Sequence, residues 1–329
     1  MTRPLRIEYP GALYHVTNRG NERKAIFKDD TDRNKFLELL ARSLDIYSVK
    51  LYSFVLMNNH FHLLVETPLG NLSQFMRHFN ISYTSAFNRR YRRSGHLYQG
   101  RYKSFLVDRD EYLSMVSRYI HLNPVKIGSV KRKPPSEQLG ILWEYQWSSL
   151  PGFVSLKRRW DFVEYGVVLE DFGGDTRQGR AHYKKQLSVD LVDELPVRNR
   201  IVAQSLLGGE DFVEKIKATY LEVDSSREQP AHAEVRKYLT KDTILDVVCR
   251  ITGKSQKQLL SNFGTERQMT MDLLYRLAGM TNPEIGHLMG IDYSTVSQGR
   301  KRLREKLRKD KLLHVMYEKI KDELSRIKI

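Results

Sequence analysis

The sequence predicts an α+β domain over residues 1–153 and an all-α region at the carboxyl end. Two stretches, "GALYHVTNRG" (11–20) and "VKLYSFVLM" (49–57), are rich in Val, Tyr and Leu and are bounded by Gly or Asn, which is typical of strands. Between them, "DDTDRNKFLELLARSLDIY" (29–47) begins with capping residues and repeats apolar residues at helical spacing. From about residue 240 the apolar spacing is helical throughout.

The stretch "MNNHFHLLVE" (57–66) continues the second predicted strand through a turn into a third strand. Asn58 and Asn59 tolerate left-handed turn geometry, so we expect an antiparallel hairpin. Strand side chains alternate faces, which puts His60 and His62 on the same side. Two imidazoles on one face suit a divalent metal, but for a His-x-His pair taken alone the alternative, hydrogen bonds within the sheet, is the more common explanation.

The stretch "EYLSMVSRYIHLNPVK" (111–126) is predicted to be a helix, because Leu113, Val116 and Ile120 recur at three- and four-residue intervals. Pro124 should end it near Asn123. Tyr119 and Asn123 then share one helical face, where they could offer a phenol nucleophile and an oxygen ligand to one site. The alternative makes Tyr119 a core tyrosine and Asn123 a helix cap.

Residues 77–103 contain many basic residues, interleaved aromatic residues and no acidic residue. Phe79, Tyr83 and Phe87 recur every four residues, so we expect them to form the core face of a helix. The absence of acidic residues favours phosphate contacts, and aromatic residues near the basic turn are candidates for base stacking. The predicted DNA-binding residues of this stretch are Arg89, Arg90, Arg92, Arg93, Arg101, Lys103 and Tyr98.

The charge balance agrees with a polyanionic partner. Fifty-five Lys and Arg residues oppose 39 Asp and Glu residues, for a net charge of +16, and we expect nucleic acid rather than a membrane surface. The start has no apolar core of signal-peptide length, and no later stretch approaches the roughly 18 apolar residues of a membrane span. We therefore expect a cytoplasmic protein.

Residues 154–239 have loop compositions around short helices and carry no chemical motif, so we assign them no role. Residues 240–329 contain "TNPEIGHLMG" followed by "DYSTVSQGRKRL", which predicts a helix, a glycine turn and a recognition-type helix. The alternative is a helical bundle with a solvated basic end. The residues predicted to face a DNA groove are Ser294, Thr295, Ser297, Gln298 and Arg300.

The combination of "HFH" and "YIHLN" resembles the single-tyrosine HUH endonucleases, named for a His, hydrophobic residue, His motif. Within these, residues 5–150 are similar to the transposases associated with repetitive extragenic palindromes, which are relatives of insertion-sequence single-strand transposases. Other matching stretches are "YHVTNRGNERKAIF", "LMNNHFHLLVETP", "AFNRRYRRSGHLYQGRYKSFLVD" and "SRYIHLNPVKIG".

This resemblance implies a ferredoxin-like antiparallel sheet with helices and a single-stranded DNA substrate folded as a palindromic hairpin. It also implies that His60, His62 and Asn123 bind Mg²⁺ or Mn²⁺ and that Tyr119 attacks the scissile phosphate. The products would be a 5′-phosphotyrosine and a free 3′-hydroxyl.

Residues 240–310 resemble the carboxy-terminal DNA-binding domain of the replication initiator DnaA, which implies duplex DNA as a second partner. They depart from it at Ile291, where the initiator has Arg, and at Tyr293, where it has His.

Two other functions stay open. One is a DNA-binding regulator whose nuclease domain is inert. The other is a plasmid replication initiator or relaxase, which the absence of a "GxxxxGK[ST]" phosphate loop disfavours.

Overall fold

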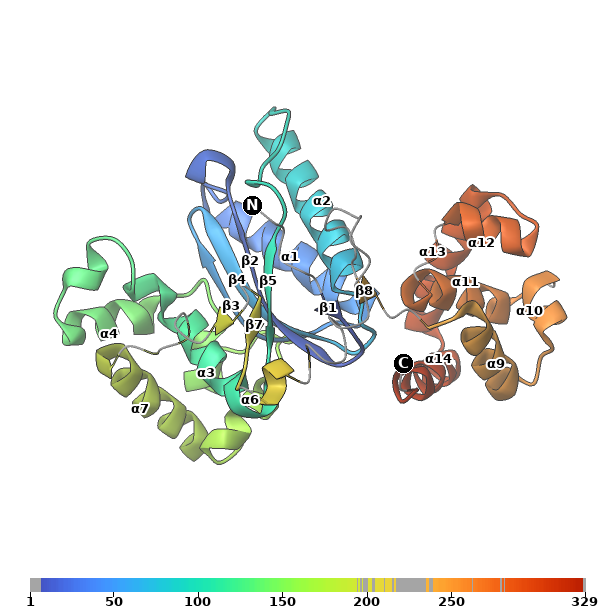
Figure 1. Cartoon of the computed structure of the whole chain (residues 1–329). Helices are drawn as coiled ribbons and strands as arrows, with labels where there is room; N and C mark the ends of the chain where they lie inside the picture. Colours follow the sequence, from blue (N-terminus) through green and yellow to red (C-terminus); the bar gives the residue numbers. More distant parts are fainter. Residues whose placement is uncertain are drawn as a thin grey trace. The chain divides into compact units, whose positions relative to one another are not determined.

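The computed structural model describes residues 7–193, residues 239–327 except 262, 279 and 281, and, between these stretches, residues 195, 197, 201–202, 205–209, 211–214, 216 and 235–236. Contacts divide the chain into two units (Figure 1). The first unit comprises Met1–Ile7, Ala12–Thr67 and Phe75–Val235, and the second comprises Glu8–Gly11, Pro68–Gln74 and Arg236–Ile329.

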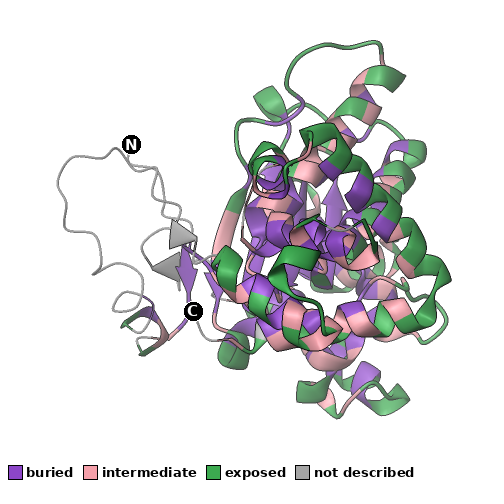
Figure 2. Ribbon diagram, turned by 90° about the vertical axis from the view of Figure 1, so that its right-hand side faces the viewer, coloured by how far each residue is buried: buried purple, intermediate pink, exposed green. Residues whose placement is uncertain are grey.

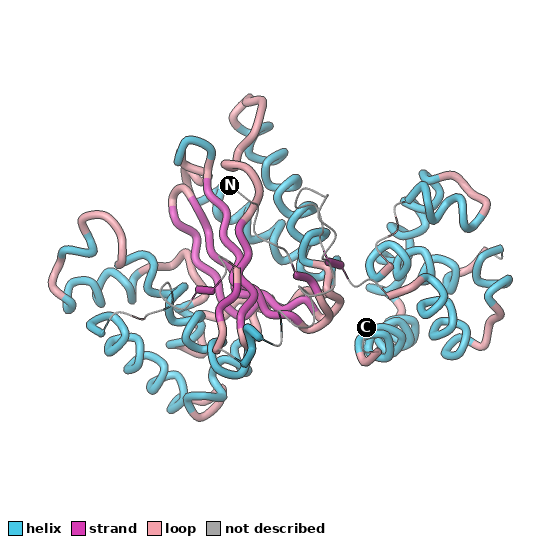
Figure 3. The backbone as a smooth tube through the Cα atoms, viewed as in Figure 1, coloured by secondary structure: helices cyan, strands magenta, loops and turns pink. Residues whose placement is uncertain are grey.

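A six-stranded sheet in the order β3-β4-β2-β5-β7-β6 forms the centre of the first unit (Figure 3). Its strands are β2 (Ala12–Arg19), β3 (Lys50–Met57), β4 (His60–Thr67), β5 (Lys103–Val107), β6 (Ile201–Val202) and β7 (Leu206–Leu207). The first four strands of this order pair antiparallel, whereas β7 joins β5 in parallel. A second, two-stranded sheet pairs β1 (Ile7–Glu8) with β8 (Val235–Arg236).

These strands confirm the predicted α+β class and the predicted hairpin. The hairpin reverses at Asn58 and Asn59, between β3 and β4. The segment 154–239 was expected to contain only short helices and loops, yet it supplies β6 and β7 at one edge of the sheet.

Helices cover both faces of the sheet. The helices of the first unit are α1 (Asp30–Tyr47), α2 (Leu72–Arg90), α3 (Arg109–Leu122), α4 (Pro135–Glu144), α5 (Leu150–Val154), α6 (Tyr165–Leu169) and α7 (Arg177–Asp193). The first residues of α2 belong to the Pro68–Gln74 segment of the second unit. Short 3-10 turns lie at Asn21–Arg23, Asn123–Val125, Val130–Arg132 and Glu170–Phe172.

On one face, Phe61 of β4 packs against Phe36 of α1 and Phe79 of α2, with ring centroids 5.0 and 6.1 Å away. On the other face, Ser117 Oγ of α3 lies 2.5 Å from Ser53 Oγ of β3. The sheet therefore separates α1 and α2 from α3 (Figure 1).

A buried polar network fastens α3 to the segment that follows it. Tyr183 of α7 places its hydroxyl 2.9 Å from Ser117 Oγ and 2.8 Å from Nδ1 of His121. Arg118 forms an ion pair with Asp190 of α7 at 2.5 Å. Residues 177–193, to which the sequence analysis assigned no role, thus pack directly on the helix that carries Tyr119.

The second unit is helical at its carboxyl end, as predicted. Its helices are α9 (Lys241–Thr252), α10 (Gln256–Ser261), α11 (Thr265–Leu277), α12 (Asn282–Met289), α13 (Tyr293–Lys309) and α14 (Lys311–Ser325). The helices carry buried residues on one side and exposed residues on the other (Figure 2). Gly290, with a φ of 64°, forms the turn between α12 and α13. Of the helices in the described part of the chain, none is long and apolar enough to cross a membrane.

Candidate active site

Strand register determines which side chains surround His60 and His62. In the β2–β4 ladder, Thr17 lies opposite His62 and Arg19 lies opposite His60. Because side chains alternate along a strand, His15, Thr17 and Arg19 share the face of the two histidines. The rings of His60 and His62 have centroids 5.2 Å apart, so the structure places both imidazoles together on the face covered by α3.

Each of these two histidines has a hydrogen-bond partner at Nδ1. His60 Nδ1 lies 2.7 Å from Asn59 Oδ1, and Asn59 donates from Nδ2 to the carbonyl oxygen of Arg23 at 2.8 Å. Since the amide oxygen of Asn59 can only accept, Nδ1 of His60 carries the proton and Nε2 carries the lone pair. His62 Nδ1 lies 2.8 Å from Nε2 of His15.

Burial keeps the imidazoles of His15 and His60 neutral near pH 7. Burial lowers the pKa of His15 to about 4. It lowers the pKa of His60 to about 4 as well, with a further contribution from the nearby charge of Arg19. A neutral imidazole does not have to lose a proton before it binds a metal ion, which favours metal binding near pH 7.

Tyr119 of α3 faces this cluster. Its ring meets the rings of His15 and His62 edge-on, with centroids 5.9 and 6.5 Å apart, and it is half-buried. Three other tyrosines, Tyr98, Tyr102 and Tyr112, lie nearby in the sequence. These three are 7%, 8% and 4% exposed, in core positions, and the described ring contacts with the histidine cluster are made by Tyr119.

Asn123 occupies the C-cap position of α3 and is buried. Its Nδ2 donates to the carbonyl oxygen of Tyr119 at 2.9 Å and to that of Ile120 at 3.3 Å. The helix-cap interpretation is therefore correct for the amide nitrogen. Because the nitrogen points back to the helix, Oδ1 is the atom of Asn123 that could act as a metal ligand.

His60, His62 and Oδ1 of Asn123 could bind a divalent metal ion without occupying all of its coordination positions. Within the described residues, no group of three or more His, Cys, Asp and Glu side chains is arranged to hold a metal ion. Two imidazoles and one amide oxygen would leave positions for phosphate oxygens and water, as catalytic metal sites require. Imidazole ligands favour Mn²⁺, whereas Mg²⁺ prefers oxygen.

The basic segment, residues 77–103, leads into β5, which pairs with β2 beside the histidines. Lys103 of β5 lies opposite Thr17, Gln99 donates its backbone NH to the carbonyl oxygen of Arg19 at 2.8 Å, and Gly20 forms a β-bridge with Tyr98. The exposed predicted DNA contacts of this segment are Arg89, Arg90, Arg92, Arg93, Arg101 and Lys103. Lys103 shares the face of the histidines, and Arg19 adds a cation there that the sequence analysis missed.

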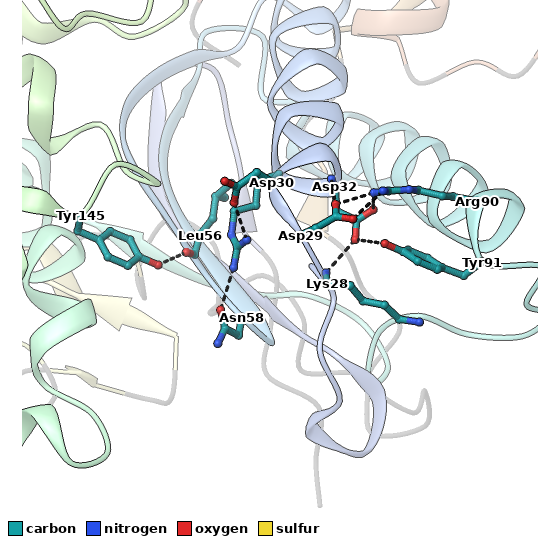
Figure 4. Close-up of polar contacts among 10 residues, drawn as sticks. Lys28, Asp29, Asp30, Asp32, Leu56, Asn58, Arg90, Tyr91 and Tyr145 are labelled. Carbon is teal, nitrogen blue, oxygen red and sulfur yellow. Dashed lines mark hydrogen bonds and ion pairs between the residues drawn. The ribbon is translucent and has the colours of Figure 1, made fainter.

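Arg90 has a different environment from the one predicted. Its guanidinium pairs with Asp29 at 2.6 Å and with Asp32 at 2.5 Å, at the amino end of α1 (Figure 4). The neighbouring Tyr91 donates its hydroxyl to Asp32 at 2.8 Å. Arg90 thus joins α2 to α1, and because its guanidinium is exposed as well as paired, the phosphate contact stays a prediction.

Tyr98 also differs from the prediction, which made it a platform for base stacking. Its ring packs edge-on against Phe61, at a centroid distance of 6.1 Å, on the α1 and α2 side of the sheet. Its hydroxyl is buried without a hydrogen-bond partner among the described atoms. Tyr98 is a core residue, because the chain around it folds against the end of β2.

The predicted groove-facing residues of α13 fall into two groups. Ser294, Thr295, Ser297 and Gln298 are exposed on one side of the helix. Arg300 is 8% exposed and forms an ion pair with the buried Asp272 at 3.2 Å, so its assignment as a DNA contact is corrected.

Sequence reasoning missed His15, Arg19 and Asn59. All three lie in stretches quoted above, and the sequence alone could have predicted that His15, Thr17 and Arg19 share one face of β2. The sequence alone could not have predicted the β2–β4 register, which brings them next to His60 and His62.

Part of the chain is similar to known proteins. Residues 9–123 match the family described as "Transposase IS200 like". One similar solved structure is a REP-associated tyrosine transposase bound to a REP hairpin, with 17% identity, a TM-score of 0.38, and coverage of 51% of this chain and 93% of that one. No curated protein matches the chain. Residues 9–123 are therefore similar to IS200-like transposases.

Proposed function

We propose that the first unit is a metal-dependent single-stranded DNA endonuclease and strand transferase. The observation that carries this proposal is the convergence of Tyr119 and His62 from separate elements on one face of the sheet, at a ring-centroid distance of 6.5 Å. The match of residues 9–123 to IS200-like transposases supports the same reaction class.

His60, His62 and Oδ1 of Asn123 would hold the metal ion, either Mn²⁺ or Mg²⁺. When bound, the ion supplies charge stabilisation at the scissile phosphate, which is worth several kcal/mol in metal-assisted displacement. The protein contributes the imidazole of His60, whose pKa burial lowers to about 4, so this ligand need not release a proton on binding. Arg19 and Lys103 add positive charge beside the site for the flanking phosphates.

Tyr119 is the nucleophile in this proposal. Its phenolic oxygen forms a bond to phosphorus as the bond from phosphorus to O3′ breaks, and the departing O3′ takes up the proton that the phenol loses. The exchange conserves one phosphodiester, because a 5′-phosphotyrosine replaces the DNA linkage and a 3′-hydroxyl leaves. The same intermediate can later accept attack by another 3′-hydroxyl, which gives strand transfer.

The substrate is single-stranded DNA folded as a palindromic hairpin. Exposed cations of the 77–103 segment, among them Arg89, Arg92, Arg93, Arg101 and Lys103, supply backbone contacts that do not depend on base sequence. The hairpin follows from the resemblance of "HFH" and "YIHLN" to palindrome-associated transposases.

The test is cleavage of three labelled oligonucleotides by the full chain at one salt concentration: a palindromic hairpin, its perfect duplex and an unstructured strand. Each is incubated with Mn²⁺, with Mg²⁺ and with a chelator. We expect nicking of the hairpin with either ion and none with the chelator. His60→Ala and His62→Ala should abolish nicking yet retain hairpin binding, whereas Asn123→Ala should reduce nicking less.

The control is Arg89→Gln, which lies at the end of α2 and removes one exposed cation without touching the histidines. It should weaken binding without abolishing nicking. Binding without any nicking by the parent protein would favour a catalytically inert DNA-binding regulator.

We also infer that the second unit binds duplex DNA through α13. The exposed Ser294, Thr295, Ser297 and Gln298 line one side of this helix, and exposed Lys301 and Arg302 follow on its next turn. These are the residue types that contact base edges and phosphates.

In the full chain, Gln298→Ala and Thr295→Ala should weaken binding to a preferred duplex while hairpin cleavage stays unchanged. Arg302→Gln should weaken binding to all duplexes alike and reduce its salt dependence. A duplex affinity that none of these variants changes would exclude α13 as the contact surface.

A further inference from the structure

We propose that His15 is a positioning residue, which accepts a hydrogen bond from Nδ1–H of His62 and so holds that ring with Nε2 as its metal-binding atom. The inference rests on the proposed metal site. It adds a residue outside the "HFH" motif and assigns a direction to one hydrogen bond.

The contact between the two rings is short and ordered by the sheet. Nε2 of His15 lies 2.8 Å from Nδ1 of His62, and the rings stack with centroids 5.1 Å apart and an interplanar angle of 20°. The two residues are diagonal neighbours in the β2–β4 ladder, since His62 lies opposite Thr17 and His15 lies opposite Leu64. The pairing therefore depends on this register and on no flexible loop.

His15 is itself held on several sides. It is 5% exposed, its ring stacks on Phe105 of β5 at a centroid distance of 5.7 Å, and it meets the edge of Tyr119 at 5.9 Å. A ring enclosed in this way has little freedom to turn. It offers Nε2 to His62 from a fixed position, and it packs against the proposed nucleophile.

The direction of the hydrogen bond follows from what metal binding requires. If His62 donates from Nδ1, its Nε2 carries a lone pair, as in metal-bound histidines whose other nitrogen donates to a second partner. If His15 donated instead, the remaining proton of His62 would lie on Nε2 and would block that atom. The His60 side of the site shows the same arrangement, with Asn59 Oδ1 as the acceptor for Nδ1.

The direct test uses the full chain with ¹⁵N-labelled histidine. Long-range ¹H–¹⁵N spectra distinguish the Nδ1–H from the Nε2–H tautomer of each ring, and the His62→Ala spectrum identifies the His62 signals. We expect His62 of the parent protein in the Nδ1–H form and His15→Leu to shift it toward Nε2–H. Finding the Nε2–H form at His62 in the parent protein would overturn the inference, whatever the variants do.

Mn²⁺ affinity, measured by calorimetry without DNA, gives a second readout. Loss of a partner that orients a metal-binding histidine typically costs about 10- to 100-fold in metal affinity, which is the loss we expect for His15→Leu. His15→Gln should bind nearly as tightly as the parent, because its amide oxygen can accept at the position of Nε2. The matched control Phe105→Leu removes the stacking partner of His15 but not the hydrogen bond, and should also bind nearly normally.

The outcomes separate this inference from the proposed function. If His62→Ala abolishes Mn²⁺ binding while His15→Leu binds like the parent, the metal site stands and the role of His15 is refuted. If parent and His62→Ala bind Mn²⁺ equally, the proposed metal site fails, and the inference about His15 fails with it.

Discussion

Substitution of Arg300 tests whether this basic residue of α13 stabilises the second unit or contacts DNA. Its Nε lies 3.2 Å from Asp272 Oδ1, its Nη1 donates to Asn282 Oδ1 at 3.1 Å, and its guanidinium lies 3.4 Å from the ring centroid of Tyr275. Asp272 is buried and also pairs with Arg276 at 2.7 Å. Replacing Arg300 with Gln would therefore remove one of the cations that neutralise this buried carboxylate.

The magnitude follows from these contacts. A hydrogen bond to a charged group contributes about 1.5–3 kcal/mol, and a desolvated cation–π contact contributes about 0.5–2 kcal/mol. Since Asp272 keeps Arg276, the larger penalty for an unpaired buried charge does not apply in full. We expect Arg300→Gln to lower the free energy of unfolding of the second unit by about 2–5 kcal/mol.

Urea unfolding can assign this loss to one unit. The three tryptophans, Trp143, Trp147 and Trp160, all lie in the first unit, so their fluorescence reports that unit alone, whereas far-ultraviolet circular dichroism reports helices of both. The Arg300→Gln variant should move a circular dichroism transition to lower urea and leave the fluorescence transition in place. Arg302→Gln, an exposed control on the same helix, should move neither. An Arg300→Gln variant that unfolds like the parent and only loses duplex affinity would refute this reasoning.

Three further predictions concern the first unit, and each is read by urea unfolding followed through tryptophan fluorescence. Tyr98→Phe should raise the free energy of unfolding by about 1 kcal/mol, because it removes a hydroxyl that is buried without a partner among the described residues, and a loss of stability would contradict this. Tyr183→Phe should lower it by about 1–3 kcal/mol, since Nδ1 of the buried His121 loses its partner, and an unchanged midpoint would count against the role of α7. Burial lowers the pKa of His121 to about 3, whereas in the unfolded chain this residue has an ordinary pKa of about 6.5. Between these two values the unfolded state binds the proton and the folded state does not, so the free energy of unfolding should fall by up to about 1.4 kcal/mol for each pH unit below about 6.5. The fall should be less steep in His121→Gln.

Local patterns were sufficient to predict the elements around the site. The helix α3 ends where Pro124 requires, and its apolar positions Val116 and Ile120 are buried as their spacing indicated. Period-two alternation placed His60 and His62 on one face before the structure was known. These features depend on residues within about ten positions of one another, which is why sequence reasoning reached them.

Contacts between distant segments could not be predicted in this way. Arg90 meets Asp29 and Asp32 about sixty residues away, and Arg300 meets Asp272 across two helices. The composition of a basic stretch does not tell which cations have such partners. The pairing of His15 with His62 likewise requires the β2–β4 register, which no local signal specifies.

The most direct test of the central claim is covalent capture of DNA by Tyr119. Tyr119→Phe keeps the ring and its contacts with His15 and His62 but removes the attacking oxygen. The full-length parent and the variant are each incubated with a labelled single-stranded hairpin and Mn²⁺, and are then separated on a denaturing gel. We predict a covalent band for the parent, attached to the fragment that carries the 5′ phosphate at the cut, and none for the variant at near-parental hairpin affinity. A covalent band in Tyr119→Phe, or an adduct peptide that contains Tyr98, Tyr102 or Tyr112, would contradict the assignment.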